Sequence, residues 1–194
     1  MNNPSDTIRD RIEAHIKTAR GLGEQSASIA SVAECFVSAI RNGGKILLCG
    51  NGGSAADAQH VAAELVGRFA RERAAWPAIA LTANSSIVTA IGNDYGYEHI
   101  FARQVAALGK KGDVVVGIST SGNSPNVLEA MREARTRGCM TIGMTGKNGK
   151  ALRELTDISV SVSSDETPRI QEAHILAWHI VCELVENDLA SPAI

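Results

Sequence analysis

The sequence predicts an α/β protein built on a three-layer, doubly wound sheet of about five parallel strands. We expect two extra N-terminal helices and a long C-terminal helix around this sheet. From residue 45 onward, apolar segments alternate with amphipathic ones, which indicates strands alternating with helices. Several apolar segments contain almost no polar residue, as expected for parallel strands covered on both faces. Glycine- and hydroxyl-rich runs follow three of them, at the strand ends where such sheets bind ligands.

Length and charge fit one ordinary globular domain. The chain has 194 residues, and we expect a single domain with N-terminal helices in 1–44 and the α/β core in 45–194. Nineteen basic residues face 21 acidic ones, so no basic surplus points to nucleic acid. No apolar run approaches the ~20 residues that span a bilayer, and the first ten residues are polar. We therefore expect a cytoplasmic protein with no nucleic-acid or membrane partner.

The cysteines predict a reducing environment rather than a disulfide framework. Four are scattered through the chain without a C-x-x-C pair, namely Cys35, Cys49, Cys139 and Cys182. In a chain without a secretion signal we interpret them as reduced, buried small residues.

Two helices are expected before the first strand. Apolar residues recur at helical spacing from Ile8 to Ala19, after Ser5 and Asp6 as plausible caps. A second helix is expected from about Glu24 to Arg41, and Asn42-Gly43-Gly44 would stop it. A minimal α/β unit does not need these helices, so they are expected to cover an edge of the fold or to pack against another subunit.

The remaining elements follow in order. The predicted strands are Lys45–Cys49, Ala78–Leu81, Asp113–Ile118, Met140–Met144 and Ile158–Val162. The predicted helices are Ser54–Phe69, Ser85–Gly92, Glu98–Leu108, Ser124–Arg137, Lys150–Leu155 and about Pro168 to Leu189. Pro125 suits the first turn of its helix, because that position needs no N–H.

Two loops have the composition of an anion site. Gly50–Ser54 and Ser119–Ser124 each join a strand to a helix N-terminus, where free backbone N–H groups and the helix dipole attract a phosphate. Hydroxyls in the second loop add donors without a lysine or a metal. Neither loop has Walker A spacing, and Ala55 replaces the third glycine of a dinucleotide fingerprint. The plain alternative is a pair of hydroxyl-capped turns.

His60 and Glu64 are a candidate ionisable pair. They are four residues apart and so project from one face of the helix that follows the first loop. Such a pair on its own is most simply an exposed surface pair. Ala62, Ala63 and Leu65 around it instead indicate a packed helix.

Several motifs together resemble a known family. These are G-N-G-G-S at 50–54, S-T-S-G-N-S at 119–124, A-Q-H-x-A-x-E-L at 58–65, A-I-G-N-D-Y-G-Y at 90–97 and R-I-Q-E-x-H at 169–174. The sequence resembles the sugar isomerase (SIS) domain, which has a flavodoxin-like fold, and within it the phosphoheptose isomerases. The resemblance covers nearly the whole chain, including the two leading helices.

The resemblance implies an aldose–ketose isomerase that converts sedoheptulose 7-phosphate to D-glycero-D-manno-heptose 7-phosphate. By resemblance, Glu64 and His179 are the catalytic acid/base pair. The implied zinc ligands are His60, Glu64, Gln171 and His179. The implied substrate-binding residues are Asn51, Gly52, Gly53, Ser54, Glu64, Asn93, Asp94, Ser119, Thr120, Ser121, Ser124 and Gln171. The family also implies a homotetramer whose active sites use residues of neighbouring subunits.

These residue types suit the chemistry. An isomerisation through an enediol needs a base at carbon and an acid or metal at the carbonyl oxygen, and histidine titrates near neutral pH. Zinc accepts imidazole nitrogen and carboxylate oxygen. Glutamine is an uncommon ligand, so we expect one removable Zn²⁺ per subunit.

Some features leave alternatives open. Some family members have a histidine where this chain has Ala55 or Ala56, and an acidic residue where Thr167-Pro168 stands. The roles of Asp165 and Glu166 stay open. The alternative function is a non-catalytic SIS protein that binds a replication-initiator protein, a class that loses the acid/base residues retained here. A sugar-phosphate-sensing module is disfavoured, because the leading helices are too short and too weakly basic for a DNA-binding domain.

Overall fold

The computed structural model describes residues 3–190 and contains one sheet of five parallel strands, as predicted. The strand order is β2-β1-β3-β4-β5, with all neighbours parallel. The strands are β1 (Ile46–Gly50), β2 (Ala78–Ala80), β3 (Val114–Ser119), β4 (Met140–Gly146) and β5 (Ile158–Val162). The order reverses between β1 and β3, so the crevice for a ligand opens at the carboxyl ends of these two strands.

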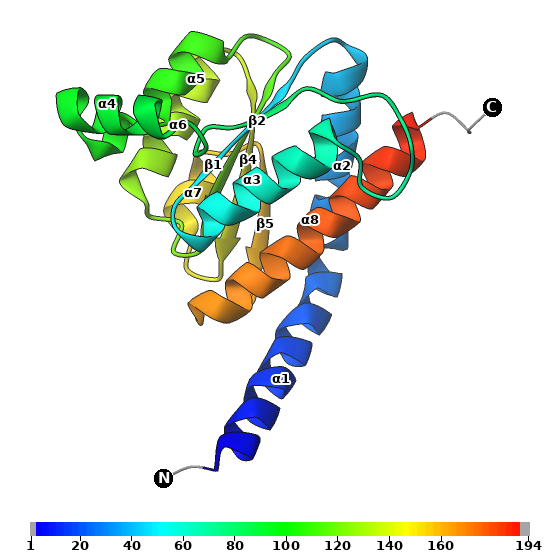
Figure 1. The fold of residues 1–194 in the computed structure, drawn as a ribbon. Helices are drawn as coiled ribbons and strands as arrows, with labels where there is room; N and C mark the ends of the chain where they lie inside the picture. The colour runs from blue at the N-terminus through cyan, green and yellow to red at the C-terminus, as the bar shows by residue number, and fades with distance from the viewer. Residues whose placement is uncertain (1–2, 191–194) are drawn as a thin grey trace.

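Helices cover both faces of the sheet, because successive strand residues point to opposite sides. One core lies under α2 (Ser26–Arg41), α3 (Gly53–Val66) and α8 (Thr167–Leu189), and includes Ile46, Val116 and Trp178. The other lies under α5 (Ala102–Leu108), α6 (Pro125–Thr136) and α7 (Lys150–Glu154), and includes Leu47 and Val115. α4 (Ser85–Tyr95) adds only half-buried side chains to this second core. The predicted three layers are confirmed (Figure 1).

Helix α1 (Pro4–Gly21) projects from the body of the molecule, beneath the first half of α8 (Figure 1). None of its residues is buried. Arg11 forms an ion pair with Glu166, the N-cap residue of α8, at 3.1 Å. His15 Nδ1 lies 2.8 Å from Glu172 Oε2 on α8 itself. The predicted caps Ser5 and Asp6 are wrong, since Asn3 caps the helix and its side chain accepts the N–H of Ser5. Among residues 3–190 no helix is long and apolar enough to cross a membrane.

The element boundaries differ from expectation at a few places. The second helix begins at Ser26, because a 3₁₀ turn, η1 (Leu22–Gln25), precedes it. The helix predicted to reach Phe69 ends at Val66, before Gly67. The segment from residue 98 contains a short 3₁₀ turn, η2 (Tyr97–His99), before α5 begins at Ala102. Gly96, with φ of 95°, separates this turn from α4 in a backbone conformation that favours glycine.

Candidate active site

The glycine loop after β1 turns sharply into α3. A Cβ on Gly50 would lie 2.7 Å from the carbonyl oxygen of Ser54, and Gly52 has φ of 55°, so both positions require glycine. Asn51 is fixed from two sides: its Oδ1 accepts the Asn126 side-chain amide at 2.8 Å and the Tyr97 hydroxyl at 3.1 Å. The Asn51 amide donates back to Asn126 at 2.9 Å. These contacts hold the loop across the crevice between β1 and β3.

The hydroxyl loop after β3 gathers its side chains at the start of α6. The Ser119 and Ser124 oxygens lie 2.9 Å apart, and Ser121 Oγ lies 3.5 Å from that of Ser119. Ser124 stands at the N-cap position, yet its hydroxyl makes no capping bond to its own helix. The carbonyl of Thr120 accepts the N–H of Gly146 at 3.0 Å, which ties the loop to the end of β4. Three hydroxyls beside a helix N-terminus form a suitable site for an anion.

Asn93 and Asp94 make no hydrogen bond to the other predicted site residues within the described part of the chain. Both are exposed on α4, and the Asn93 amide donates to Asp94 Oδ1 at 2.7 Å. Among the described residues, no hydrogen bond joins this pair to either loop. Tyr97, just beyond α4, does reach the glycine loop through its hydrogen bond to Asn51. The role of Asn93 and Asp94 in a sugar site therefore stays a prediction.

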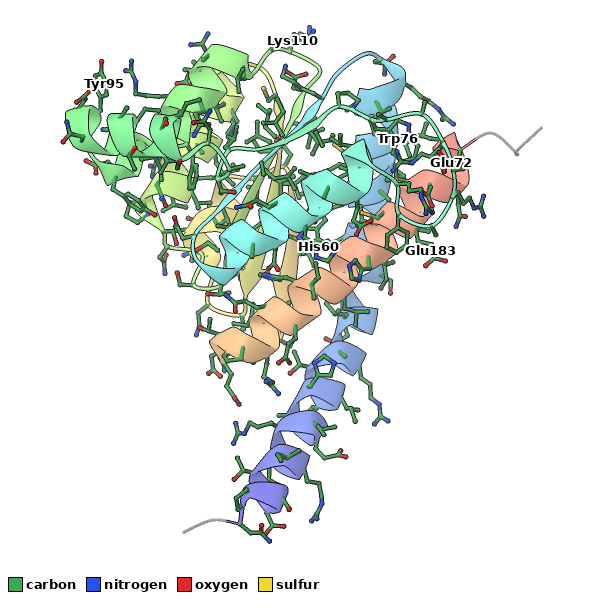
Figure 2. All side chains as sticks on the ribbon, in the orientation of Figure 1. His60, Glu72, Trp76, Tyr95, Lys110 and Glu183 are labelled. Atoms are coloured by element: carbon green, nitrogen blue, oxygen red, sulfur yellow. The ribbon has the colours of Figure 1, made fainter. Side chains whose placement is uncertain are left out.

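His60, Glu64 and His179 come together from two helices. α3 carries His60 and Glu64, α8 carries His179, and in Figure 2 His60 lies between the two helices. His60 Nε2 is 3.0 Å from Glu64 Oε1 and 3.4 Å from His179 Nε2. One ligand atom from each residue lies within 4.8 Å of the other two. Two imidazoles and a carboxylate at this spacing fit the donor preference of Zn²⁺.

Gln171 lies at the beginning of the same helix pair. A Cβ on Gly53 would be 2.4 Å from the Gln171 amide nitrogen, so this side chain rests on the start of α3. α3 and α8 run side by side in the same direction, with His60 and His179 meeting further along (Figure 1). Gln171 is thus beside the glycine loop, and its ligation of a metal stays a prediction.

Asp57 is a candidate site residue that the sequence motifs did not single out. It stands one turn before His60 on α3, and its Oδ2 is buried without a hydrogen-bond partner among the described residues. Burial raises its pKa to about 6, although His60 acts in the opposite direction. Its position three residues before His60 was the available signal, but an aspartate near the start of a helix is usually interpreted as a helix-dipole residue.

His174 is buried on α8, in contact with the end of β4. Its side chain is fully buried, with Nε2 3.3 Å from the Thr145 carbonyl. Burial lowers its pKa to about 4, so the ring is neutral near pH 7.

Phe69, Tyr97 and Asn126 were missed because their roles depend on partners distant in the sequence. The Phe69 ring lies 5.7 Å from that of His179, centroid to centroid. Tyr97 and Asn126 both hold Asn51. No local pattern marks such contacts.

Comparison with known proteins identifies the class of protein to which this chain belongs. The SIS domain family matches residues 11–146. A phosphoheptose isomerase of Nitratiruptor sp. is 61% identical over 181 residues, with 93% of this chain and 97% of the relative covered. One of Roseiflexus sp. is 56% identical, with 97% and 98% covered. The structure of a phosphoheptose isomerase from Francisella tularensis superposes with a TM-score of 0.92 at 40% identity, covering 96% of this chain and all of that one.

These likenesses extend over the whole fold, including both leading helices. The chain belongs to the phosphoheptose isomerase family of SIS-domain aldose–ketose isomerases.

Proposed function

We propose that this protein converts sedoheptulose 7-phosphate to D-glycero-D-manno-heptose 7-phosphate through an enediol, the first step of heptose synthesis for bacterial lipopolysaccharide or capsule. The observation that carries the proposal is the meeting of His60, Glu64 and His179 from two helices. In a chain of this family, the helix α3 that carries His60 and Glu64 begins at the glycine loop, one of two loops suited to a sugar phosphate.

The substrate phosphate is assigned to the hydroxyl loop. The Ser119 hydroxyl lies 2.9 Å from that of Ser124 and 3.5 Å from that of Ser121, and the N-terminus of α6 adds the positive end of its dipole. Thr120 completes this loop. The sugar hydroxyls are assigned to the Asn51-Gly52-Gly53 turn and Ser54 beside it, with Asn93 and Asp94 reaching them from α4.

Zinc is the metal that the cluster of His60, Glu64 and His179 favours, with one ion per subunit. Gln171 is proposed as the fourth ligand by resemblance to the family. When bound, it would act as a Lewis acid on the substrate carbonyl. Glu64 takes the proton from carbon, because a carboxylate is an effective general base at that position. His179 moves the second proton between the substrate oxygens.

Purified protein given sedoheptulose 7-phosphate tests the proposal. We expect an aldose 7-phosphate product, activity lost after chelation and regained with Zn²⁺. Absence of that product both with and without added zinc would refute the isomerase reaction.

The alternative of a non-catalytic protein that binds a replication initiator is not supported. The relatives of this chain described above are named as isomerases, and Glu64 and His179 are both present in one cluster.

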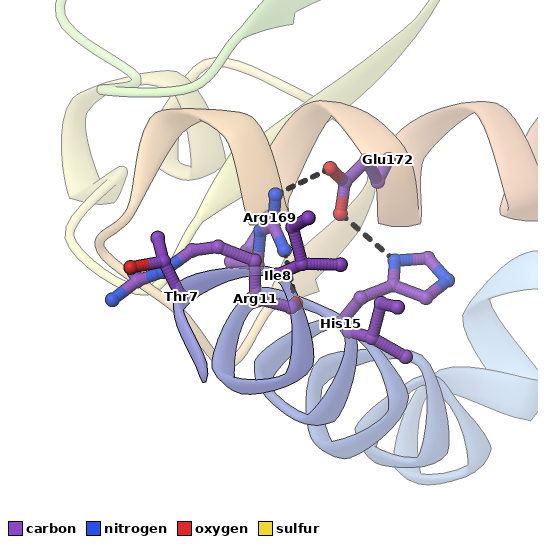
Figure 3. A pocket seen from close by; sticks show the side chains of 7 residues that line it. Thr7, Ile8, Arg11, His15, Arg169 and Glu172 are labelled. Atoms are coloured by element: carbon purple, nitrogen blue, oxygen red, sulfur yellow. Dashed lines mark hydrogen bonds and ion pairs between the residues drawn. The ribbon is translucent and has the colours of Figure 1, made fainter. Parts of the chain in front are cut away.

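A homotetramer is part of the same proposal. Ile8 and Ile12 on α1 are 61% and 53% exposed, and with Arg169 and Glu172 they line a groove of ≈ 510 Å³ between α1 and α8 (Figure 3). Leu176, Ile180 and Leu184 form a second exposed apolar stripe on α8, at four-residue spacing. These surfaces suit contact with further copies of the chain, because exposed apolar patches mark association sites.

A cytoplasmic location also belongs to the proposal. It is supported by the four free cysteines, since disulfides are rare in a reducing compartment.

A further inference from the structure

The loop between α3 and β2, residues 67–77, is anchored on one carboxylate of α8. Glu186 Oε1 accepts the N–H of Phe69 at 3.0 Å, and Oε2 accepts those of Ala70 and Arg71 at 2.9 Å each. Arg73 Nε donates to the same carboxylate at 3.2 Å. The Glu186 side chain is 2% exposed, so this acceptor is buried and fully used.

Arg73 connects the anchor to the last turn of α3. Its guanidinium donates to the backbone carbonyls of Glu64 (2.6 Å) and Leu65 (2.9 Å), and also to those of Gly67 and Ala74. The terminal carbonyls of a helix lack partners within the helix, so Arg73 caps α3. The guanidinium also lies 3.6 Å from the ring centroid of Trp76, which covers it. The Arg73 side chain is 4% exposed.

The pair therefore joins the two helices that carry the candidate metal ligands. Arg73 holds the backbone of Glu64 itself on α3, and Glu186 stands two turns beyond His179 on the same helix. The loop that they fix carries Phe69, whose ring packs on that of His179. His60, Glu64 and His179 can bind one metal ion together only while α3 and α8 keep the spacing that brings these three side chains into contact.

We infer that Arg73 and Glu186 are positioning residues that hold the ligands of α3 and α8 at metal-binding distance. The inference rests on the proposed metal site. Neither residue touches the substrate or the metal, and both act through the end of α3 and through Phe69. Groups outside the ligand shell that orient the ligands commonly change metal affinity by about 10–100-fold when removed.

The test measures zinc affinity directly, by competition with a chromogenic chelator, on the full-length protein. Glu186→Gln keeps the side-chain shape but turns an N–H₂ group toward backbone donors and removes the charge. We expect zinc affinity to fall on the order of tenfold or more. The kcat should also fall, while KM for sedoheptulose 7-phosphate stays near the wild-type value. Arg73→Lys retains the charge but cannot reach four carbonyls, so we expect a smaller loss.

Asp113→Asn is the matched control. Asp113 is also a fully buried carboxylate, and it accepts the backbone N–H groups of Lys45 and Lys110. It also forms an ion pair with the Lys45 ammonium. However, it lies at the amino end of β3, away from the metal ligands. The melting temperature should fall in this variant as in Glu186→Gln. Its zinc affinity should not change.

Wild-type zinc affinity in folded Arg73→Lys and Glu186→Gln would overturn the inference. An equal loss of affinity in Asp113→Asn would also overturn it, because the effect would then follow general stability. If Glu186→Gln shows no cooperative thermal transition, Arg73→Lys decides. Failure of the wild-type protein to bind zinc is a different result, and it would refute the proposed metal site itself.

Discussion

Among single residues, Glu64 contributes to the candidate site through both its side chain and its backbone. Its side chain is 22% exposed and meets His60 at 3.0 Å, while its backbone carbonyl is held by Arg73. The side chain is thus accessible, whereas the backbone is fixed. This separation allows the side chain to be changed with little effect on the fold.

Glu64→Gln should abolish turnover while the fold and phosphate binding persist. An amide cannot accept the proton from carbon, and loss of a general base typically costs about 10²–10⁴-fold in rate. The isomerase assay measures the loss, and circular dichroism checks the fold. Glu72→Gln is the control, because Glu72 lies in the following loop with its side chain 90% exposed. Wild-type turnover in Glu64→Gln would remove Glu64 from the role of base.

Asp57 is expected to lower the stability of the fold as the pH rises, whereas a salt-bridged acid raises it. Its pKa is raised from 3.8 to about 6 by burial, so folding favours the protonated form. Its contribution to stability is complete below pH 3.8 and is lost as the pH rises through about 6. Asp57→Asn should therefore melt at the wild-type temperature near pH 4 and a few degrees higher at pH 8.

Thermal unfolding of both proteins from pH 4 to 8, with chelator present, measures this effect. At this chain length about 2–4 °C corresponds to each kcal/mol. A difference in melting temperature that is constant across the range would show that Asp57 is not the titrating group.

Much of the candidate site was predictable residue by residue, because its motifs are local. His60 and Glu64 share a helix face at i,i+4 spacing, and the glycine loop carries its own backbone requirement. Asp57 was not predictable, since only the folded structure shows that its Oδ2 is buried with no hydrogen-bond partner among residues 3–190. Contacts of Asn51 with Tyr97 and Asn126 span 46 and 75 residues of sequence, which no local pattern encodes.

Among secondary-structure elements, periodicity identified the strands and helices better than their ends. All five strands are where the apolar segments predicted them, within one or two residues at each end. The end of α3 was wrong by three residues, because Phe69 has the apolar character of the preceding helix. Its backbone N–H is instead held by Glu186, a contact across 117 residues.

The loop from Ser119 to Ser124 should govern substrate affinity rather than chemistry. Combining Ser119→Ala with Ser124→Ala removes two hydroxyls that lie 2.9 Å apart, and hydrogen bonds to charged groups contribute about 1.5–3 kcal/mol each. We expect KM to rise at least tenfold with kcat little changed, because the phosphate is remote from the reacting carbons.

Steady-state kinetics with sedoheptulose 7-phosphate measures both constants. Combining Ser26→Ala with Ser38→Ala, both on α2, is the control and should leave KM unaltered. A KM that does not respond to the loop variant would place the phosphate elsewhere.

For the whole molecule, the feature that a single chain does not explain is α1. It buries no residue of its own and extends away from both cores (Figure 1). The sequence allowed two outcomes for the leading helices, covering an edge of the fold or meeting another subunit. α2 covers one face of the sheet, whereas α1 leaves Ile8 and Ile12 in solvent. An exposed apolar helix face is expected to gain stability by association, at roughly 25 cal/mol per Å² buried.

Ile8→Glu combined with Ile12→Glu should therefore dissociate the proposed tetramer without unfolding the subunit. Both side chains are more than half exposed in the single chain, so the substitutions remove no core contact, and glutamate preserves helix propensity. Light scattering after size-exclusion chromatography should give four copies for the wild type and fewer for the variant. Leu108→Glu, which changes an apolar side chain that is 40% exposed at the end of α5, should keep the wild-type mass. A wild-type protein that elutes as a monomer would refute the tetramer, and a variant that keeps four copies would place its interface away from α1.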